Sequence, residues 1–270
     1  MCGRYVLVQK IEVLEQRFNV TVPMDFDFKP SYNISPGKFA PVITCENPKT
    51  LQLFQFGLTP FWAKKKMYLF NARAEGDRNK ENDSNFTGAK DIINKPAFRK
   101  PVRSQRCLIP ADAFIEGTIS EGLNQPFLVH LQNKERPFAF AGIYDQWKNE
   151  ETGELVNSFA IITTAANDLL KKIPHDRCPF ILTREQESKW LNPKTHLTDI
   201  TKILYPYPAE KMNAFPISAE IKNPKNGNKS LIIPLGANLQ NEMTIKSTKE
   251  IKLEGMGNRN RNDDTLKTHP

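Results

Sequence analysis

The stretch Phe138-Ala139-Phe140-Ala141-Gly142-Ile143-Tyr144-Asp145-Gln146-Trp147 is the clearest guide to the fold. Large apolar side chains alternate along it with small or polar ones, which is typical of a half-buried β-strand. Residues 51–56, 127–131 and 159–164 follow a similar pattern. We therefore expect a fold in which strands dominate.

Helical patterns are fewer and lie between the expected strands. Apolar residues repeat at helical spacing in Ile11, Leu14 and Phe18, and again in Leu197, Ile200 and Leu204. The segment Thr183-Arg184-Glu185-Gln186 has the form of a capping box, which predicts a helix that begins there. Twenty prolines punctuate short elements, and no repeat of 20 to 50 residues is visible. The pattern favours an α+β, β-rich domain over regular βαβ winding.

Length and composition point to a soluble globular protein. The 270 residues are 39% hydrophobic and 25% charged, which excludes collagen-like, coiled-coil and wholly disordered classes. No stretch approaches the ~20 apolar residues needed to cross a bilayer. The first residues, Met1-Cys2-Gly3-Arg4-Tyr5, lack the features of an export signal, so we expect a cytoplasmic protein without a membrane partner.

The charge is concentrated in the body of the chain. Residues 237–270 are poor in aromatic and β-branched runs, and we expect them to form a disordered tail behind one domain of residues 1–236. The tail holds six Lys or Arg and five Asp or Glu, so the formal net charge of +8 belongs almost wholly to the domain. A basic domain is consistent with an anionic partner but does not identify it.

The four cysteines give no sign of a metal or redox site. No Cys-x-x-Cys pair is present, which argues against a zinc ribbon, and a disulfide framework is not expected at this length in a reducing compartment. We expect no metal and no cofactor. Cys45, Cys107 and Cys178 are most simply buried thiols.

Cys2 differs from the other three because removal of Met1 would make it the amino terminus. It would then carry an α-amine, with an ordinary pKa of about 7.7–8.0, beside a thiol, with an ordinary pKa of about 8.5. The amine can form a Schiff base with an aldehyde, and the tethered thiol can close onto the imine carbon to give a thiazolidine. Taken alone, a cysteine at this position can be accidental.

Six ordered motifs give Cys2 more weight. They are Met1-Cys2-Gly3-Arg4-Tyr5, Tyr32-Asn33-Ile34-Ser35-Pro36-Gly37, Asn71-Ala72-Arg73-Ala74-Glu75, Cys107-Leu108-Ile109-Pro110-Ala111-Asp112-Ala113-Phe114-Ile115-Glu116, Ile162-Thr163-Thr164-Ala165-Ala166 and Ile173-Pro174-His175-Asp176-Arg177-Cys178-Pro179. In this order they closely resemble the SOS response-associated peptidase (SRAP) family, whose members process abasic sites in DNA. The resemblance covers about residues 2–235 and implies a barrel-like antiparallel core with flanking helices.

The resemblance also implies roles for eight residues. Cys2 matches the nucleophile that ends as a thiazolidine crosslink to the opened sugar, and Asn71 matches an asparagine near that linkage. Glu116 and His175 match the pair that handles protons. Arg4, Arg73, Arg177 and Trp62 match the DNA-binding residues, the arginines on phosphates and the tryptophan as a wedge against a base. The implied partner is single-stranded DNA with an abasic site, bound by a monomer.

Each active-site residue also has a structural interpretation. Asn71 could be a turn residue, Glu116 could close a loop, and His175 could belong to a surface ion pair. The chain also departs from the family pattern: Gly117 stands where a tryptophan is usual, and Phe56-Gly57 where Trp-Gly is common. We expect the missing ring at Gly117 to loosen the packing around the Glu116 carboxyl group.

A basic stretch with aromatic residues nearby is a candidate DNA-binding surface. Lys95, Arg99, Lys100, Arg103 and Arg106 lie close together, and Phe61, Trp62 and Tyr68 flank the three lysines 64–66. Basic groups beside exposed rings suit single-stranded nucleic acid, because every base has a face that can stack. A solvated surface without ligand is the alternative.

Three functions remain open from the sequence. The first is covalent capture of abasic sites, accompanied by weak Schiff-base lyase activity and with self-removal of Met1 left open. The second is a thiol peptidase that uses Cys2 with a histidine and a carboxyl group. The third is a noncatalytic, basic DNA-binding module, which would bind in a salt-sensitive way without preference for abasic DNA.

Overall fold

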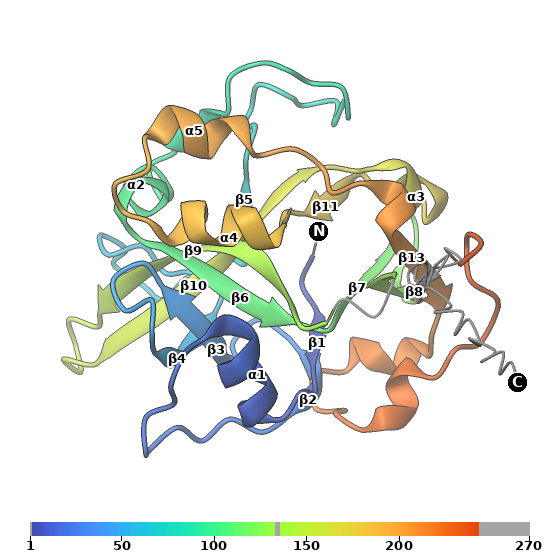
Figure 1. Cartoon of the computed structure of the whole chain (residues 1–270), viewed down its shortest axis with the longest axis horizontal. Helices are drawn as coiled ribbons and strands as arrows, with labels where there is room; N and C mark the ends of the chain where they lie inside the picture. Colours follow the sequence, from blue (N-terminus) through green and yellow to red (C-terminus); the bar gives the residue numbers. More distant parts are fainter. Residues whose placement is uncertain (1, 133–135, 243–270) are drawn as a thin grey trace, which may run out of the picture.

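Strands make up most of the regular structure of the computed structural model, which describes residues 2–132 and 136–242 (Figure 1). The strands are β1 (Tyr5–Leu7), β2 (Ser31–Ile34), β3 (Phe39–Thr44), β4 (Leu51–Phe56), β5 (Asn71–Arg73), β6 (Arg106–Ala111), β7 (Ala113–Thr118), β8 (Gly122–Leu131), β9 (Phe138–Lys148), β10 (Leu155–Ala165), β11 (Arg177–Pro179), β12 (Ile181–Leu182) and β13 (Met212–Pro216). The α-helices are α1 (Ile11–Phe18), α2 (Pro101–Ser104), α3 (Asp168–Lys172), α4 (Arg184–Leu191) and α5 (Leu197–Lys202), and the 3₁₀ helices are η1 (Asp91–Asn94), η2 (Ala209–Lys211), η3 (Ala219–Lys222) and η4 (Lys229–Ile232).

Five strands close into a barrel. β3 pairs with β4 and β6, β6 pairs with β9, and β9 pairs with β10, all antiparallel; β10 then returns to β4 in a parallel pairing that completes the ring. Closure leaves none of these five strands with a free edge inside the ring. The barrel-like antiparallel core expected of an α+β chain is confirmed, with β4–β10 as its one parallel contact in the ring.

A second sheet carries the first strand of the chain. Its order is β13-β8-β7-β1-β2, and every pairing in it is antiparallel. Tyr5 in β1 joins this sheet to the barrel, because its ring packs edge-on against Phe56 of β4 at 5.6 Å and Phe140 of β9 at 5.9 Å. Tyr5 is completely buried. This anchor fixes the position of the residues just before it, including Cys2.

The expected helices are confirmed at α1, α4 and α5. α4 begins with the full capping box: the Thr183 side chain accepts from the Gln186 amide, and the Thr183 amide donates to Gln186 Oε1. α4 covers the outside of the barrel, where Trp190 is completely buried and its indole Nε1 donates to Cys107 O at 3.0 Å. This cover explains why β9 is buried on both faces.

Two residues shortly after the expected boundary at residue 236 are bonded to β13. Leu239 N donates to Ala214 O at 2.8 Å, and Asn213 Nδ2 donates to Gln240 O at 2.8 Å, so this segment is held against β13. The rest of the expected tail, residues 243–270, lies outside the described residues. Among the helices that are described, none has the length and hydropathy needed to cross a bilayer.

Candidate active site

Cys2 lies three residues before Tyr5, where β1 begins, and is completely buried. Its carbonyl oxygen accepts a 2.9 Å hydrogen bond from Asn71 Nδ2, and its Sγ lies 4.0 Å from Arg4 O. Asn71 is the first residue of β5, which runs parallel to β10. Asn71 is therefore a strand residue that clamps Cys2, and the turn interpretation is wrong.

Glu116 and His175 meet as a buried pair. Glu116 Oε2 lies 3.2 Å from His175 Nε2, and the two side chains are only 2% and 7% exposed. Glu116 belongs to β7, and His175 lies two residues before β11. The interpretations of Glu116 as a loop residue and of His175 as a surface residue are both wrong.

The second imidazole nitrogen of His175 restricts where protons can lie. Nδ1 is 2.8 Å from Gly117 O, and a carbonyl oxygen can only accept, so Nδ1 carries a hydrogen. In a neutral imidazole Nε2 would then be an acceptor that faces Glu116 Oε2. A hydrogen bond between Nε2 and Oε2 therefore requires one further proton, carried by either Glu116 or His175. Glu116 and His175 thus face each other next to Cys2 in a geometry suited to sharing a proton.

The Cys2 thiol belongs to the same cluster. Burial raises its pKa well above the ordinary value, and the Glu116 charge and a hydrogen bond to the Glu116 side chain act in the same direction. Cys2, Asn71, Glu116 and His175, which the sequence only suggested as a group, are thus brought together. Cys178 is also buried here, and burial followed by the Glu116 charge raises its pKa. The sequence analysis gave Cys178 no role, although it lies only three residues after His175.

Gly117 does not loosen the site, contrary to expectation. A Cβ atom on Gly117 would lie 2.0 Å from Gly122 O, because the β7–β8 hairpin closes tightly where its register shifts after Gly117. The strand backbone, rather than an aromatic ring, fills this space. Glu116 accordingly remains almost completely buried.

Arg4 and Arg73 lie on the rim of the site. Arg4 Nη1 donates to Asn33 Oδ1 at 2.9 Å and Nη2 to Lys222 O at 2.6 Å. Arg73 Nη2 donates to Asn79 O and, at 2.7 Å, to Asn82 Oδ1. Both arginines are partly exposed, so their positions are compatible with contact to DNA.

Arg177 is placed differently. Its guanidinium group pairs with Glu75 at 2.8 Å, with side chains only 5% and 3% exposed, and also donates to Thr163 O. Glu75 in turn accepts from the Ala165 amide at 3.0 Å. This ion pair occupies Arg177, so the geometry lends no support to direct phosphate contact. The role of Glu75 was not predictable from the sequence, since its partner lies 102 residues away along the chain.

Exposed aromatic rings lie on the segment before β5. Phe61, Trp62 and Tyr68 are about half exposed, at 53%, 50% and 47%. The Lys100 ammonium lies 4.5 Å from the centre of the Phe61 ring, and Lys66 lies 5.9 Å from that of Tyr68. Basic groups and rings are therefore combined as expected from residues 61–68.

The basic stretch of residues 95–106 is not a uniform cationic surface. Arg106 is 1% exposed, and its guanidinium group donates to the carbonyl groups of Val102, Arg103, Trp190 and Asn192. It thus satisfies carbonyls at the ends of α2 and α4, a structural task. The expectation that Arg106 shares an exposed basic stretch is wrong.

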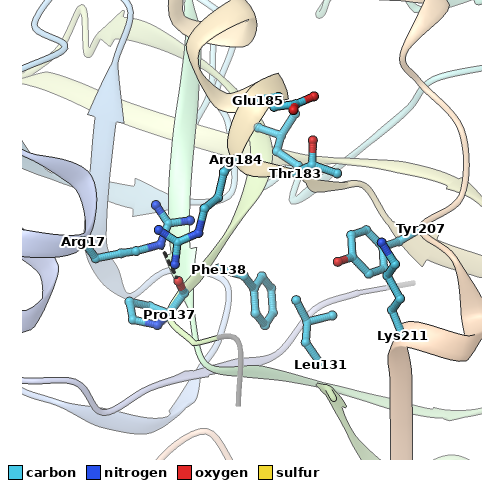
Figure 2. Close-up of a pocket in the computed structure, with 10 residues that line it drawn as sticks. Arg17, Leu131, Pro137, Phe138, Thr183, Arg184, Glu185, Tyr207 and Lys211 are labelled. Atoms are coloured by element: carbon cyan, nitrogen blue, oxygen red, sulfur yellow. Dashed lines mark hydrogen bonds between the residues drawn. The ribbon is translucent and has the colours of Figure 1, made fainter. Parts of the chain in front are cut away.

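A pocket of about 340 Å³ lies elsewhere in the molecule and includes none of the eight candidate residues. Figure 2 shows Arg17 and Arg184 on one side of it, with Tyr207 and Lys211 on the other. Arg17 is already paired with Glu187 at 2.6 Å. Within residues 2–132 and 136–242, no three His, Cys, Asp or Glu side chains are grouped as metal ligands would be.

Comparison with known proteins agrees with this geometry. The family model described as SOS response associated peptidase (SRAP) matches residues 1–224. The abasic site processing protein YoqW of Bacillus subtilis is 36% identical over 239 residues, which cover 86% of this chain and 99% of that protein. The abasic site processing protein HMCES of Gallus gallus is 24% identical over 277 residues, which cover 88% of this chain and 78% of that protein.

Solved structures share the fold. A crystal structure of a protein from Bacteroides thetaiotaomicron superposes with a TM-score of 0.71 at 28% identity and covers 86% of this chain and 98% of that one. A protein from Bordetella bronchiseptica, 22% identical, has the same fold with a TM-score of 0.63 over 80% of this chain. On the extent of the family match and the identity to YoqW, the chain belongs to the SOS response associated peptidase (SRAP) family.

Proposed function

We propose that this protein captures abasic sites in single-stranded DNA as a covalent thiazolidine on Cys2. The observation that carries the proposal is the cluster of Cys2, Asn71, Glu116 and His175 at the start of β1. Similarity to relatives that are called abasic site processing proteins supports the same substrate. Met1 must be removed first, by an aminopeptidase or by the site itself.

The chemistry needs no external oxidant or cofactor. The freed Cys2 amine attacks the aldehyde carbon of the opened deoxyribose, and loss of one water from the carbinolamine gives an imine. The thiol then adds across the C=N bond: sulfur bonds to carbon, and the thiol proton ends on nitrogen. Because both nucleophiles belong to one residue, ring closure is intramolecular and fast.

The Glu116–His175 pair supports the proton transfers. Expulsion of water requires a proton on the departing hydroxyl group, and Glu116 or His175 in its protonated form would supply it. The Cys2 thiol is hydrogen-bonded to Glu116, which can accept its proton as sulfur attacks. Asn71 holds the Cys2 carbonyl and keeps the nucleophile in place. The same imine could also undergo β-elimination, so the proposal includes weak lyase activity.

The rim residues suit a single strand. Exposed Phe61, Trp62 and Tyr68 offer stacking faces, and Arg4 and Arg73 offer cationic groups beside Cys2. One copy of the chain contains all of these residues, so the proposal includes action as a monomer.

A thiol peptidase fits this geometry less well. A peptidase needs a thiolate, whereas burial and Glu116 raise the pKa of Cys2. His175 Nε2 faces Glu116 Oε2, and Nδ1 faces Gly117 O. An amine that attacks first does not require a thiolate.

The test is formation of a heat-stable adduct with abasic single-stranded DNA, using protein whose intact mass shows that Met1 is absent. Wild type and Cys45→Ala should form it, and Cys2→Ala should not; Cys45 is a matched control because it is also a buried thiol but lies outside the cluster. An alanine inserted between Met1 and Cys2 should also abolish the adduct, because the amine and thiol are then on different residues.

The outcomes separate the three functions. Peptide cleavage that survives the insertion would favour a thiol peptidase. Salt-sensitive binding with no preference for abasic DNA, unchanged in Cys2→Ala, would favour a noncatalytic module. Absence of an adduct with Met1-free wild type rejects the proposal.

A further inference from the structure

A tight turn places Lys38 beside the active site. Lys38 N donates to Ser35 O at 3.1 Å, Pro36 follows Ser35, and Gly37 has a φ of +93°, which suits the third position of a type II turn. The turn folds the Lys38 side chain back onto β2, where its Nζ donates to Asn33 O at 2.8 Å. Its position is therefore set by the backbone and not by a carboxylate.

Asn33 brings Lys38 next to Arg4. Arg4 Nη1 donates to Asn33 Oδ1 at 2.9 Å, so the two cations are bound to the same residue. Asn33 is completely buried, and its Nδ2 donates to the carbonyl groups of Ile221, Asn223 and Asn226. Because both the oxygen and the nitrogen of its side-chain amide form hydrogen bonds, Asn33 holds the two cations in fixed positions.

Lys38 and Arg4 are two cations without a carboxylate partner among residues 2–132 and 136–242. Each of them is partly buried. Burial, and then the nearby charge of Arg4, lower the pKa of Lys38. An anion between them would relieve this repulsion.

Unused hydrogen-bonding atoms accompany the cations. The Ser35 hydroxyl group and Arg4 Nε are both buried without a hydrogen-bond partner among residues 2–132 and 136–242. Ser35 is 97% buried, since only 3% of its surface is exposed. Buried polar atoms are normally paired, so these atoms indicate a ligand with acceptor oxygens.

The location fits the path of a DNA strand. Arg4 is two residues after Cys2, and at the other end of the turn a Cβ on Gly37 would lie 3.7 Å from the exposed Tyr68 ring. Arg4 thus follows the nucleophile closely in sequence, and the turn that carries Lys38 lies against a ring suited to stacking.

We infer that Lys38 and Arg4 form a subsite for one backbone phosphate of the DNA strand, next to the captured lesion. Lys38 is the new element of this subsite; the inference deepens the proposed function and rests on it. A phosphate has the charge and the acceptor oxygens that the two cations and Ser35 require.

The test is the salt dependence of binding to undamaged single-stranded DNA, measured by fluorescence anisotropy. Loss of one phosphate contact lowers the slope of log K against log salt by about 0.7 for a single strand. We expect this decrease for Lys38→Met, wild-type behaviour for Lys38→Arg, and no change for Lys189→Met. Lys189 is an exposed lysine of α4, so its replacement removes the same charge away from the site.

Equal slopes for Lys38→Met and Lys189→Met overturn the inference, as does a wild-type protein without salt-dependent binding. Thermal unfolding of each variant verifies folding, and Lys38→Arg tests the charge should Lys38→Met fail to fold. Adduct formation with abasic DNA is assayed separately. If no adduct forms but the slopes differ as expected, the covalent function is rejected and the phosphate subsite is kept. If the adduct forms but the slopes are equal, only the subsite is rejected.

Discussion

Replacing Gly117 by alanine tests how the β7–β8 hairpin holds the active site. The added Cβ would lie 2.0 Å from Gly122 O, 2.2 Å from Gly122 C and 2.8 Å from Leu123 N. All three are backbone atoms, so no side-chain rotation can relieve the clash. The hairpin would have to open by about 1 Å for the closest contact to reach 3.0 Å, below which Cβ contacts essentially do not occur. Overpacking of this kind costs about 1–3 kcal/mol.

Urea and thermal unfolding measure this cost. For a domain of this size we expect the Tm to fall by roughly 2–12 °C, since 1 kcal/mol corresponds to about 2–4 °C. Adduct yield with abasic DNA should fall as well, because Gly117 O accepts the hydrogen bond that orients His175.

Gly227→Ala is the matched control. A Cβ on Gly227 meets nothing within 4 Å, and Gly227 does not have a positive φ in the range that disfavours alanine. It should be neutral or stabilising by about 0.4–1 kcal/mol. If Gly117→Ala unfolds with a free energy within about 0.5 kcal/mol of wild type, the typical range for harmless substitutions, the argument from hairpin closure fails.

Three further predictions concern buried charge, pH and the exposed rings. Arg177→Met should lower the free energy of unfolding by about 3–5 kcal/mol, because it leaves Glu75 buried without its ion-pair partner. Arg184→Met, at an exposed position, should change this free energy little. Equal effects of the two substitutions would contradict a structural role for the Glu75–Arg177 pair. Burial raises the pKa of Cys107, so the folded state keeps a proton that the unfolded chain releases at about pH 8.5. The free energy of unfolding measured in urea should therefore decrease as the pH rises above about 8.5, and should do so less in Cys107→Ala. Trp62→Ala should weaken binding of single-stranded DNA by about 1–3 kcal/mol in anisotropy titrations while leaving the Tm unchanged, and unaltered affinity would remove Trp62 from the DNA-binding surface.

Local patterns in the sequence predicted the elements well. Alternation identified β4, β9 and β10, and helical spacing with a capping box identified α1, α4 and α5. These signals depend on neighbouring residues, and their physical causes are local. The ring that joins β9, β10 and β4 could not be read from them, because closure depends on pairings between distant strands.

The site was predictable only as a set of residues. The motifs selected Cys2, Asn71, Glu116 and His175, but no local pattern distinguishes an exposed arginine from a buried one. Arg106 is surrounded by basic residues in sequence, yet it is buried because four backbone carbonyls accept from it. Whether an arginine is buried or exposed therefore depends on partners that are remote in sequence.

The Glu75–Arg177 pair has a consequence for how the protein opens locally. Glu75 follows the strand that begins with Asn71, Arg177 follows His175 by two residues, and Glu75 is also bonded to the end of β10. The segments that carry Asn71 and His175 are therefore tied to each other by this buried ion pair as well as by the pairing of β5 and β11 with β10. Amide hydrogens in the two segments should exchange with solvent as one cooperative unit, so that a fluctuation which exposes one half dismantles the other at the same time.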